Sequence, residues 1–144
     1  MNESTLLSRE QLSVEERALV EAAESAAGRA YAPYSHYSVG AAVQSESGQL
    51  FTGCNVENAS YGATMCAERS AIFALVAAGQ RQIRAVAVYA PGEPMAMPCG
   101  MCRQVIAELC VDAPVLVAGP RGVLRRQFAA LLPEAFRLIR EGEP

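Results

Sequence analysis

Three cysteines and one glutamate have the residue types and the spacing of a hydrolytic zinc site. Glu68 follows Cys66 by two residues, and Pro98 precedes a Cys-x-x-Cys motif formed by Cys99 and Cys102. Thiolates bind zinc well, and three protein ligands leave the fourth tetrahedral position for water, whereas a structural zinc site usually has four protein ligands. The pattern therefore predicts a catalytic zinc site, with one Zn²⁺ per chain held by Cys66, Cys99 and Cys102.

Glu68 is predicted to move protons and not to bind the metal. Side chains at positions i and i+2 of a helix point apart, so Glu68 does not easily reach the ion that Cys66 binds. A carboxyl group beside zinc-activated water can take a proton from it and pass protons to a ring nitrogen and to a leaving amine. A ligand-x-Glu motif followed by Pro-Cys-x-x-Cys is typical of zinc enzymes that deaminate nucleobases.

Both cysteine segments are expected at helix N-termini, where free N–H groups and the helix dipole stabilise thiolates. Three thiolates around Zn²⁺ leave a net negative centre, and a neighbouring cation would offset that charge. Arg69 lies three residues after Cys66, on the same helical face, and is the first candidate for this role. Arg103 is the second candidate.

A closed structural zinc site is the alternative interpretation of the cysteines, with Cys54 or Cys110 as the fourth ligand. Such a site would leave Glu68 without a role. A disulfide framework is a poor explanation, because the cysteines number five and two of them form a tight Cys-x-x-Cys pair.

Composition favours one globular domain over residues 1–144. Hydrophobic residues make up 51% of the chain, and the formal net charge of −3 argues against a protein that binds nucleic acid. The first seven residues lack the features of an export signal, and no apolar run is long enough to cross a membrane. With the free thiols, these features predict a cytoplasmic protein that acts on a small molecule.

Hydrophobic periodicity and turn signals predict helices and short strands in alternation. A capping box formed by Ser13 and Glu16 starts the first helix, and Gly79 stops the second. The predicted helices cover 14–30, 66–78 and 100–110, and the predicted strands cover 39–44, 50–56, 85–89 and 115–117. The alternation after Gly48 predicts parallel crossover units and helices packed on a mixed sheet. The apolar segment 128–139 is expected to pack on another surface.

Six segments make the chain resemble the small homotetrameric, zinc-dependent cytidine deaminases over most of its length. They are 30–35, 39–42, 52–62, 66–69, 98–105 and 131–136. The resemblance implies an α/β fold with three layers, α-β-α, around a mixed five-stranded sheet. It also implies hydrolytic deamination of cytidine and 2′-deoxycytidine to uridine and 2′-deoxyuridine, with release of ammonia, as part of pyrimidine salvage.

The same resemblance assigns roles to residues around the predicted metal. Asn55 and Glu57 resemble the pair that binds the ribose 3′-hydroxyl, and an amide and a carboxylate can donate to and accept from one hydroxyl. Glu68 and the backbone near Ala67 resemble the groups that read the cytosine ring. Arg69 matches the arginine that donates hydrogen bonds to the zinc thiolates.

Two aromatic residues match positions that reach the active site of a neighbouring subunit, namely Tyr61 and Phe136. The resemblance therefore implies a homotetramer with shared active sites.

Two positions depart from the common pattern of the family. Tyr37 stands where phenylalanine usually packs near the base, so its hydroxyl needs a partner or solvent, and Met97 stands where serine is more frequent before Pro98.

The sequence leaves two competing functions open. One is deamination of a related cytosine nucleoside such as blasticidin S, although Asn55, Glu57 and the segment 131–136 favour an ordinary nucleoside. The other is a non-catalytic zinc scaffold or a binder of single-stranded RNA, against which the acidic net charge and the presence of Glu68 argue. Release of ammonia from a nucleoside would separate an enzyme from a scaffold.

Overall fold

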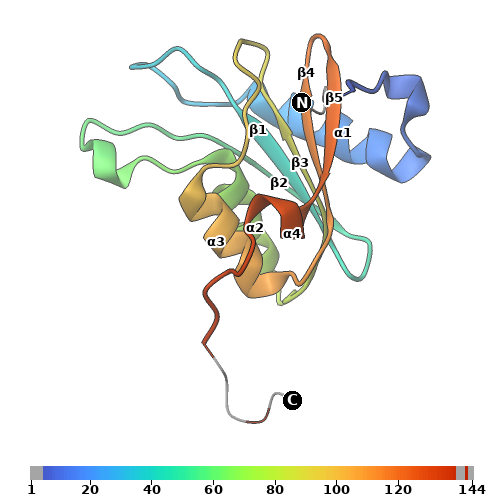
Figure 1. Cartoon of the computed structure of the whole chain (residues 1–144). Coiled ribbons are helices and arrows are strands. Elements are labelled where there is room, and N and C mark those ends of the chain that lie inside the picture. Colours follow the sequence, from blue (N-terminus) through green and yellow to red (C-terminus); the bar gives the residue numbers. More distant parts are fainter. Residues whose placement is uncertain (1–4, 139–141, 143–144) are drawn as a thin grey trace.

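A single mixed sheet lies at the centre of the computed structural model, which describes residues 5–138 and 142. Its strand order is β2-β1-β3-β4-β5 (Figure 1). The strands β3 and β4 pair in parallel, and the other neighbouring pairs are antiparallel. The strand bounds are β1 (Gly40–Ser45), β2 (Leu50–Cys54), β3 (Ile83–Tyr89), β4 (Pro114–Gly119) and β5 (Gly122–Gln127).

Helices cover both faces of this sheet, which confirms the predicted three-layer arrangement. One face packs on α1 (Val14–Ala27), and the other packs on α2 (Ala67–Ala77), α3 (Gly100–Leu109) and the short α4 (Phe128–Leu131). Successive side chains of a strand point to opposite faces. Val43 and Val86 accordingly belong to the core under α2 and α3, and Ala42 and Ala87 belong to the core under α1. No helix among the described residues is long and apolar enough to cross a membrane.

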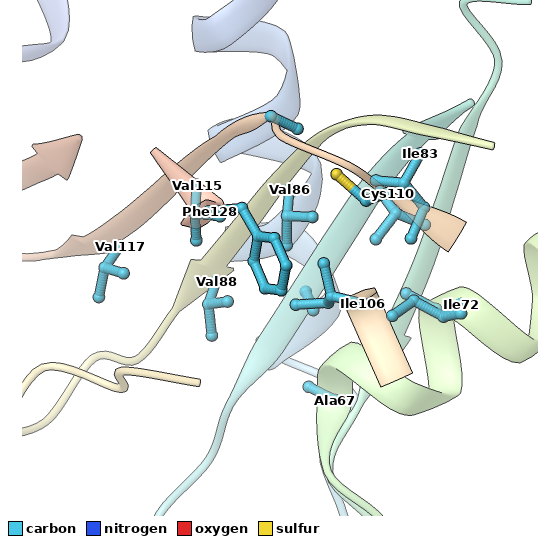
Figure 2. Close-up of a cluster of buried hydrophobic side chains, with 14 of the residues drawn as sticks. Ala67, Ile72, Ile83, Val86, Val88, Ile106, Cys110, Val115, Val117 and Phe128 are labelled. Carbon is cyan, nitrogen blue, oxygen red and sulfur yellow. The ribbon is translucent and has the colours of Figure 1, made fainter. Parts of the chain in front are cut away.

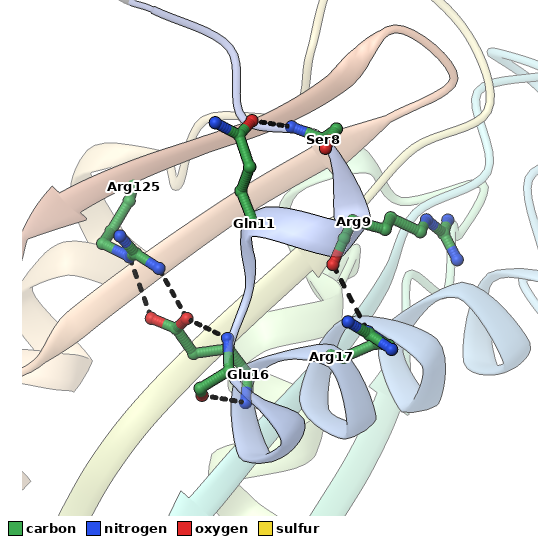
Figure 3. Close-up of polar contacts among 7 residues, drawn as sticks. Ser8, Arg9, Gln11, Glu16, Arg17 and Arg125 are labelled. Carbon is green, nitrogen blue, oxygen red and sulfur yellow. Dashed lines mark hydrogen bonds and ion pairs between the residues drawn. The ribbon is translucent and has the colours of Figure 1, made fainter.

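The predicted capping box starts α1 (Figure 3). The Glu16 amide donates to the Ser13 hydroxyl oxygen at 3.1 Å, and the Glu16 carboxylate accepts from the Ser13 amide at 3.0 Å. The same carboxylate accepts from Nε of Arg125 on β5 at 2.8 Å, so the start of the helix is tied to the edge of the sheet. The helix ends at Ala27, three residues before the predicted end, with Gly28 as its C-cap.

Two expectations about the sheet need correction. The edge strand β5 escaped prediction, because its second half, Arg125 to Gln127, is polar and lacks the apolar alternation of a strand. The sequence predicted more than one parallel crossover unit. The described residues contain a single parallel pair of strands, β3 and β4, which α3 connects. The strands β1 and β2 instead form the predicted hairpin, which turns at Gly48 with a φ of +89°.

The C-terminal segment packs on the α2 and α3 side of the sheet, as its apolar character predicts. Phe128 is buried among valines of β3 and β4 and Ile106 of α3 (Figure 2). Leu131 and Leu132 are partly buried against the same cluster. Phe136 and Leu138 are instead exposed, and Ile139, the last residue of the predicted segment, lies outside the described residues.

Candidate metal centre and active site

The two predicted cysteine segments meet where α2 and α3 begin. Cys66 is the N-cap of α2, Cys99 is the N-cap of α3, and Cys102 lies in the first turn of α3. Ala67 of α2 and Ile106 of α3 belong to the same buried core. The three Sγ atoms lie within 4.8 Å of one another, and the Sγ atoms of Cys66 and Cys99 are 3.8 Å apart.

This arrangement fits a tetrahedral metal. Sulfurs that bind zinc at about 2.3 Å in a tetrahedron lie about 3.8 Å from one another. The closed structural alternative fails among the described residues, because the metal-binding group there contains three cysteines alone. The Cys54 thiol donates to the Arg29 carbonyl oxygen at 3.5 Å, and Cys110 is buried in the core just after α3. A tetrahedral metal held by Cys66, Cys99 and Cys102 would therefore have one position for a non-protein ligand.

The Arg69 guanidinium contacts the cysteine cluster directly. Its Nη2 donates to Sγ of Cys66 at 3.2 Å, while its Nε is buried without a hydrogen-bond partner in the described structure. Hydrogen bonds from Cys102, Arg69 and Cys99 hold the pKa of the Cys66 thiol well below its usual value, against the opposing effect of burial. Cys66 is thus prepared as a thiolate, the form that binds a metal.

Arg103, the second candidate for this cation, has a different role in the structure. Its Nε donates to the Pro98 carbonyl oxygen at 2.7 Å, and its Nη1 donates to the Leu131 carbonyl oxygen at 2.8 Å. These contacts point the guanidinium at two backbone segments, so Arg69 is the arginine placed to balance the thiolate charge.

Replacement of Arg69 by alanine is expected to weaken zinc binding by roughly 10- to 100-fold, the usual effect of losing a group that supports metal ligands. Loss of the cation leaves the cluster more negative and makes each thiolate easier to protonate, so the loss should grow as the pH falls. Competition with a chelating dye across a pH series measures this effect. Arg69→Lys is the matched control, since it keeps the charge but loses the fork of donors. Unchanged affinity in Arg69→Ala would assign the charge balance to the helix dipoles.

Glu68 lies beside the sulfurs in the first turn of α2 and is only 4% exposed. Burial, together with the charge of Cys66, raises its pKa to about 7, although a backbone hydrogen bond and a weaker one with Cys102 oppose the shift. A carboxyl group with a pKa close to neutral can both accept and release protons, as a general acid–base requires. A carboxyl group suited to proton transfer therefore lies beside the predicted metal ligands, and its role as the proton carrier stays a prediction.

The predicted sugar-binding pair follows β2 and supports the loop that precedes β1. The Asn55 side chain accepts from the Val39 amide at 2.8 Å and donates to the Tyr37 carbonyl oxygen at 2.8 Å. The Glu57 carboxylate accepts from the amides of Tyr34 and Ser35 at 3.0 and 3.1 Å. Both side chains thus shape this loop, and their contact with a sugar hydroxyl stays a prediction.

The remaining predicted residues divide into buried and exposed groups. Ala67 is fully buried at the first position of α2, and half-buried Tyr37 donates its hydroxyl to the Pro94 carbonyl oxygen. This bond supplies the partner that the tyrosine hydroxyl requires. Tyr61 is 76% exposed, with its ring edge-on to Tyr34 at 5.9 Å, and Phe136 is 70% exposed. The part that these two rings play in a neighbouring subunit's site stays a prediction.

Sequence reasoning did not identify Pro94 and Gln104 as residues that support the site. It also did not predict the contacts that Arg103 makes. Their bonds involve main-chain carbonyl oxygens, which every residue carries, so no residue type or spacing could have revealed them. A surface depression of about 880 Å³ is lined by none of the three predicted metal ligands and by none of the predicted substrate-binding residues. It is lined by polar and apolar side chains that include Glu46, Arg81, Asp112 and Arg137.

Comparison with known proteins decides the family of the chain. The family model described as the cytidine and deoxycytidylate deaminase zinc-binding region matches residues 13–118. The chain belongs to this family. It is 45% identical over 120 residues to a cytidine deaminase of Sporosarcina psychrophila, covering 82% of this chain and 88% of that protein. It is 43% identical over 121 residues to a cytidine deaminase of Mycobacterium tuberculosis, covering 81% of this chain and 85% of that protein.

Solved structures of this deaminase family confirm the fold class. A cytidine deaminase from Burkholderia pseudomallei superposes with a TM-score of 0.80 at 44% identity, covering 87% of this chain and all of that one. A cytidine deaminase from Mycobacterium leprae superposes with a TM-score of 0.74 at 41% identity, covering 85% of this chain and all of that one. The mixed five-stranded sheet with helices on both faces is therefore the fold of the deaminase family.

Proposed function

We propose that the protein is a zinc-dependent deaminase that converts cytidine and 2′-deoxycytidine, with water, to uridine and 2′-deoxyuridine and ammonia. One observation carries the proposal: three thiols suited to zinc surround an open position beside a buried, readily protonated Glu68. Family membership and 43–45% identity to proteins named cytidine deaminase support the same reaction.

The chain's own residues divide the work of this reaction. Zinc bound to Cys66, Cys99 and Cys102 would lower the pKa of a water molecule and make it nucleophilic near neutral pH. Glu68 takes the proton of the water that attacks C4 of the base and delivers a proton to the ring nitrogen. It then helps to deliver another proton to the departing ammonia. Burial of Glu68 keeps competing bulk water away from these transfers.

An ultraviolet assay with a nucleoside panel tests the substrate class. Cytidine and 2′-deoxycytidine should show the ultraviolet spectral change from cytosine to uracil and should release ammonia. Free cytosine, which lacks the sugar expected to contact Asn55 and Glu57, should react far more slowly. Preference for blasticidin S over cytidine would favour the alternative deaminase. Zinc-loaded protein that releases ammonia from none of these compounds would favour the scaffold.

A homotetramer with shared active sites is the assembly that we propose for this function. Tyr61, Phe136 and Leu138 expose 76%, 70% and 74% of their surfaces in one chain. Large exposed apolar side chains on a small protein are suited to burial in an interface between subunits. A neighbouring subunit would cover them and would gain Phe136 as the ring over its bound base.

Phe136→Ala is expected to raise KM for cytidine about fivefold, equal to the roughly 1 kcal/mol of one lost aromatic contact. The change in kcat should be smaller, because the ring holds the base and does not move protons. Val14→Ala is the matched control, since Val14 is also largely exposed but lies on α1, which packs on the other face of the sheet.

Mixed tetramers test the sharing itself. Refolding Phe136→Ala chains with Glu68→Gln chains should create some sites that combine an intact Glu68 with an intact Phe136, so that part of the normal KM returns. A monomer that is fully active at nanomolar concentration, by sedimentation alongside the assay, would contradict shared sites.

The cytoplasm is the compartment that we propose for this reaction, with a place in pyrimidine salvage. The proposed metal site uses three thiolates, which a reducing compartment preserves. The net charge of −3 gives no basis for binding nucleic acid, so a small nucleoside is the proposed partner.

A further inference from the structure

Two neighbouring side chains of α3 hold the C-terminal segment against the helix. Nη1 of Arg103 donates to the Leu131 carbonyl oxygen at 2.8 Å. Nε2 of Gln104 donates to the Phe136 carbonyl oxygen at 2.9 Å. Figure 1 shows the chain leaving α4 and passing α3 on its way to the C-terminus. The backbone on both sides of the turn at Pro133 is therefore bound to one helix.

Arg103 also contacts the turn that carries a predicted metal ligand. Its Nε donates to the carbonyl oxygen of Pro98, a buried residue directly before Cys99, at 2.7 Å. The flat guanidinium presents several donors in fixed directions, so one side chain can hold two carbonyl oxygens in a set relation. Arg103 thus joins the start of the Cys-x-x-Cys motif to the segment that leads to Phe136.

A third contact fixes the far end of this segment. Nη2 of Arg137 donates to the Cys110 carbonyl oxygen at 2.8 Å, and its Nη1 donates to the Ala107 carbonyl oxygen. Carbonyl groups in the last turn of a helix lack partners within the helix, and a cation there is favourable to the helix dipole. The main chain at Phe136 is anchored on both sides, while the ring itself is 70% exposed.

We propose that Gln104 and Arg103 are positioning residues for the deaminase reaction. Gln104 fixes the main chain of Phe136 so that the exposed ring is presented in one direction to a substrate in a neighbouring site. Arg103 ties the same segment to the turn before Cys99. Helix α3 thereby links the metal ligands of one subunit's active site to the Phe136 ring that enters a neighbouring subunit's active site. This inference rests on the proposed function and on the role proposed there for Phe136.

A double-mutant cycle tests whether Gln104 acts through Phe136. Gln104→Met removes the donor at similar length and should raise KM for cytidine about two- to tenfold, the range of one hydrogen bond, with kcat and zinc content unchanged. Gln104→Glu, of the same shape but without the donor, should do the same. In the Phe136→Ala background, Gln104→Met should change KM no further. Additive effects of the two substitutions would overturn the proposal.

Arg103 should differ from Gln104 in a measurement that needs no substrate. Arg103→Met should speed the loss of zinc to a chelator and also raise KM, whereas Gln104→Met should leave zinc loss unchanged. If Arg103→Met does not fold, Arg103→Lys serves instead, because one ammonium group cannot hold both carbonyl oxygens in the same way. Equal zinc retention in folded Arg103 variants and the original chain would overturn the link to Cys99.

Fluorescence distinguishes failure of this inference from failure of the proposed function. The chain contains no tryptophan, so Phe136→Trp introduces a single reporter at the ring position. Adding Gln104→Met should lower its fluorescence anisotropy and increase its quenching by acrylamide, whether or not the protein deaminates cytidine. Unchanged anisotropy and quenching would show that Gln104 does not hold the ring. An original chain that fails to deaminate cytidine would contradict the proposed function alone.

Discussion

Replacement of Glu68 by glutamine is expected to lower kcat for cytidine by about 100- to 10,000-fold, the usual contribution of a positioned acid–base group. An amide has nearly the shape of the carboxyl group but cannot carry protons between water, the ring nitrogen and ammonia. Zinc content and fold should stay unchanged, because Glu68 is not among the three sulfur ligands. Steady-state ultraviolet kinetics, zinc analysis and circular dichroism on the same preparation measure all three quantities.

Glu57→Gln is the matched control for this substitution. Glu57 is the other carboxylate predicted in the site, and it binds the amides of Tyr34 and Ser35 instead of facing the sulfurs. Its loss should raise KM more than it lowers kcat. If Glu68→Gln kept activity within about tenfold of the original chain, Glu68 would not be the proton carrier.

Replacement of Gly40 by alanine is expected to cost at least about 3 kcal/mol of unfolding free energy, the upper range for an overpacked core. A Cβ atom at Gly40 would lie 2.0 Å from the Ala23 carbonyl oxygen and 2.3 Å from the Ala27 amide nitrogen. Both are main-chain atoms of α1, so the helix as a whole would have to move away from β1. Urea unfolding followed by circular dichroism measures the change.

Gly62→Ala is the control, because a Cβ atom there meets nothing within 4 Å. Its free energy of unfolding should stay within about 0.5 kcal/mol of the original value, as for most surface substitutions. A Gly40→Ala protein as stable as Gly62→Ala would show that α1 does not approach β1 as described.

The metal site was accessible to sequence reasoning because its information is local. Cysteine is a zinc ligand wherever it stands, and the spacing in Cys66-x-Glu68 and Cys99-x-x-Cys102 fixes where each side chain lies around its helix start. The contact of Arg69 with Cys66 could be predicted because the two residues are only three positions apart at the start of one helix. The contacts of Arg103 could not be predicted in this way.

Features that depend on contacts between distant chain segments could not be predicted from local sequence patterns. Strand β5 forms because β4 offers an unpaired edge, and the register pairs Val115 with Arg126, so packing overrides a polar local sequence. The bonds from Arg103 to Pro98 and Leu131 depend on how the C-terminal segment folds back over α3. The role of Phe136 in a neighbouring site was predicted from a family resemblance, because the sequence of one chain does not reveal which active site an exposed ring would reach.

Removal and return of zinc, with cytidine deamination followed in the ultraviolet, tests the central claim most directly. A chelator should abolish turnover, and stepwise addition of Zn²⁺ should restore it in proportion to bound metal, reaching a plateau at about one zinc per chain. Cys99→Ser protein, treated in the same way, should bind zinc more weakly and recover far less activity. Full turnover in protein freed of metal, or no release of ammonia from cytidine at one zinc per chain, would contradict the proposed zinc-dependent deaminase.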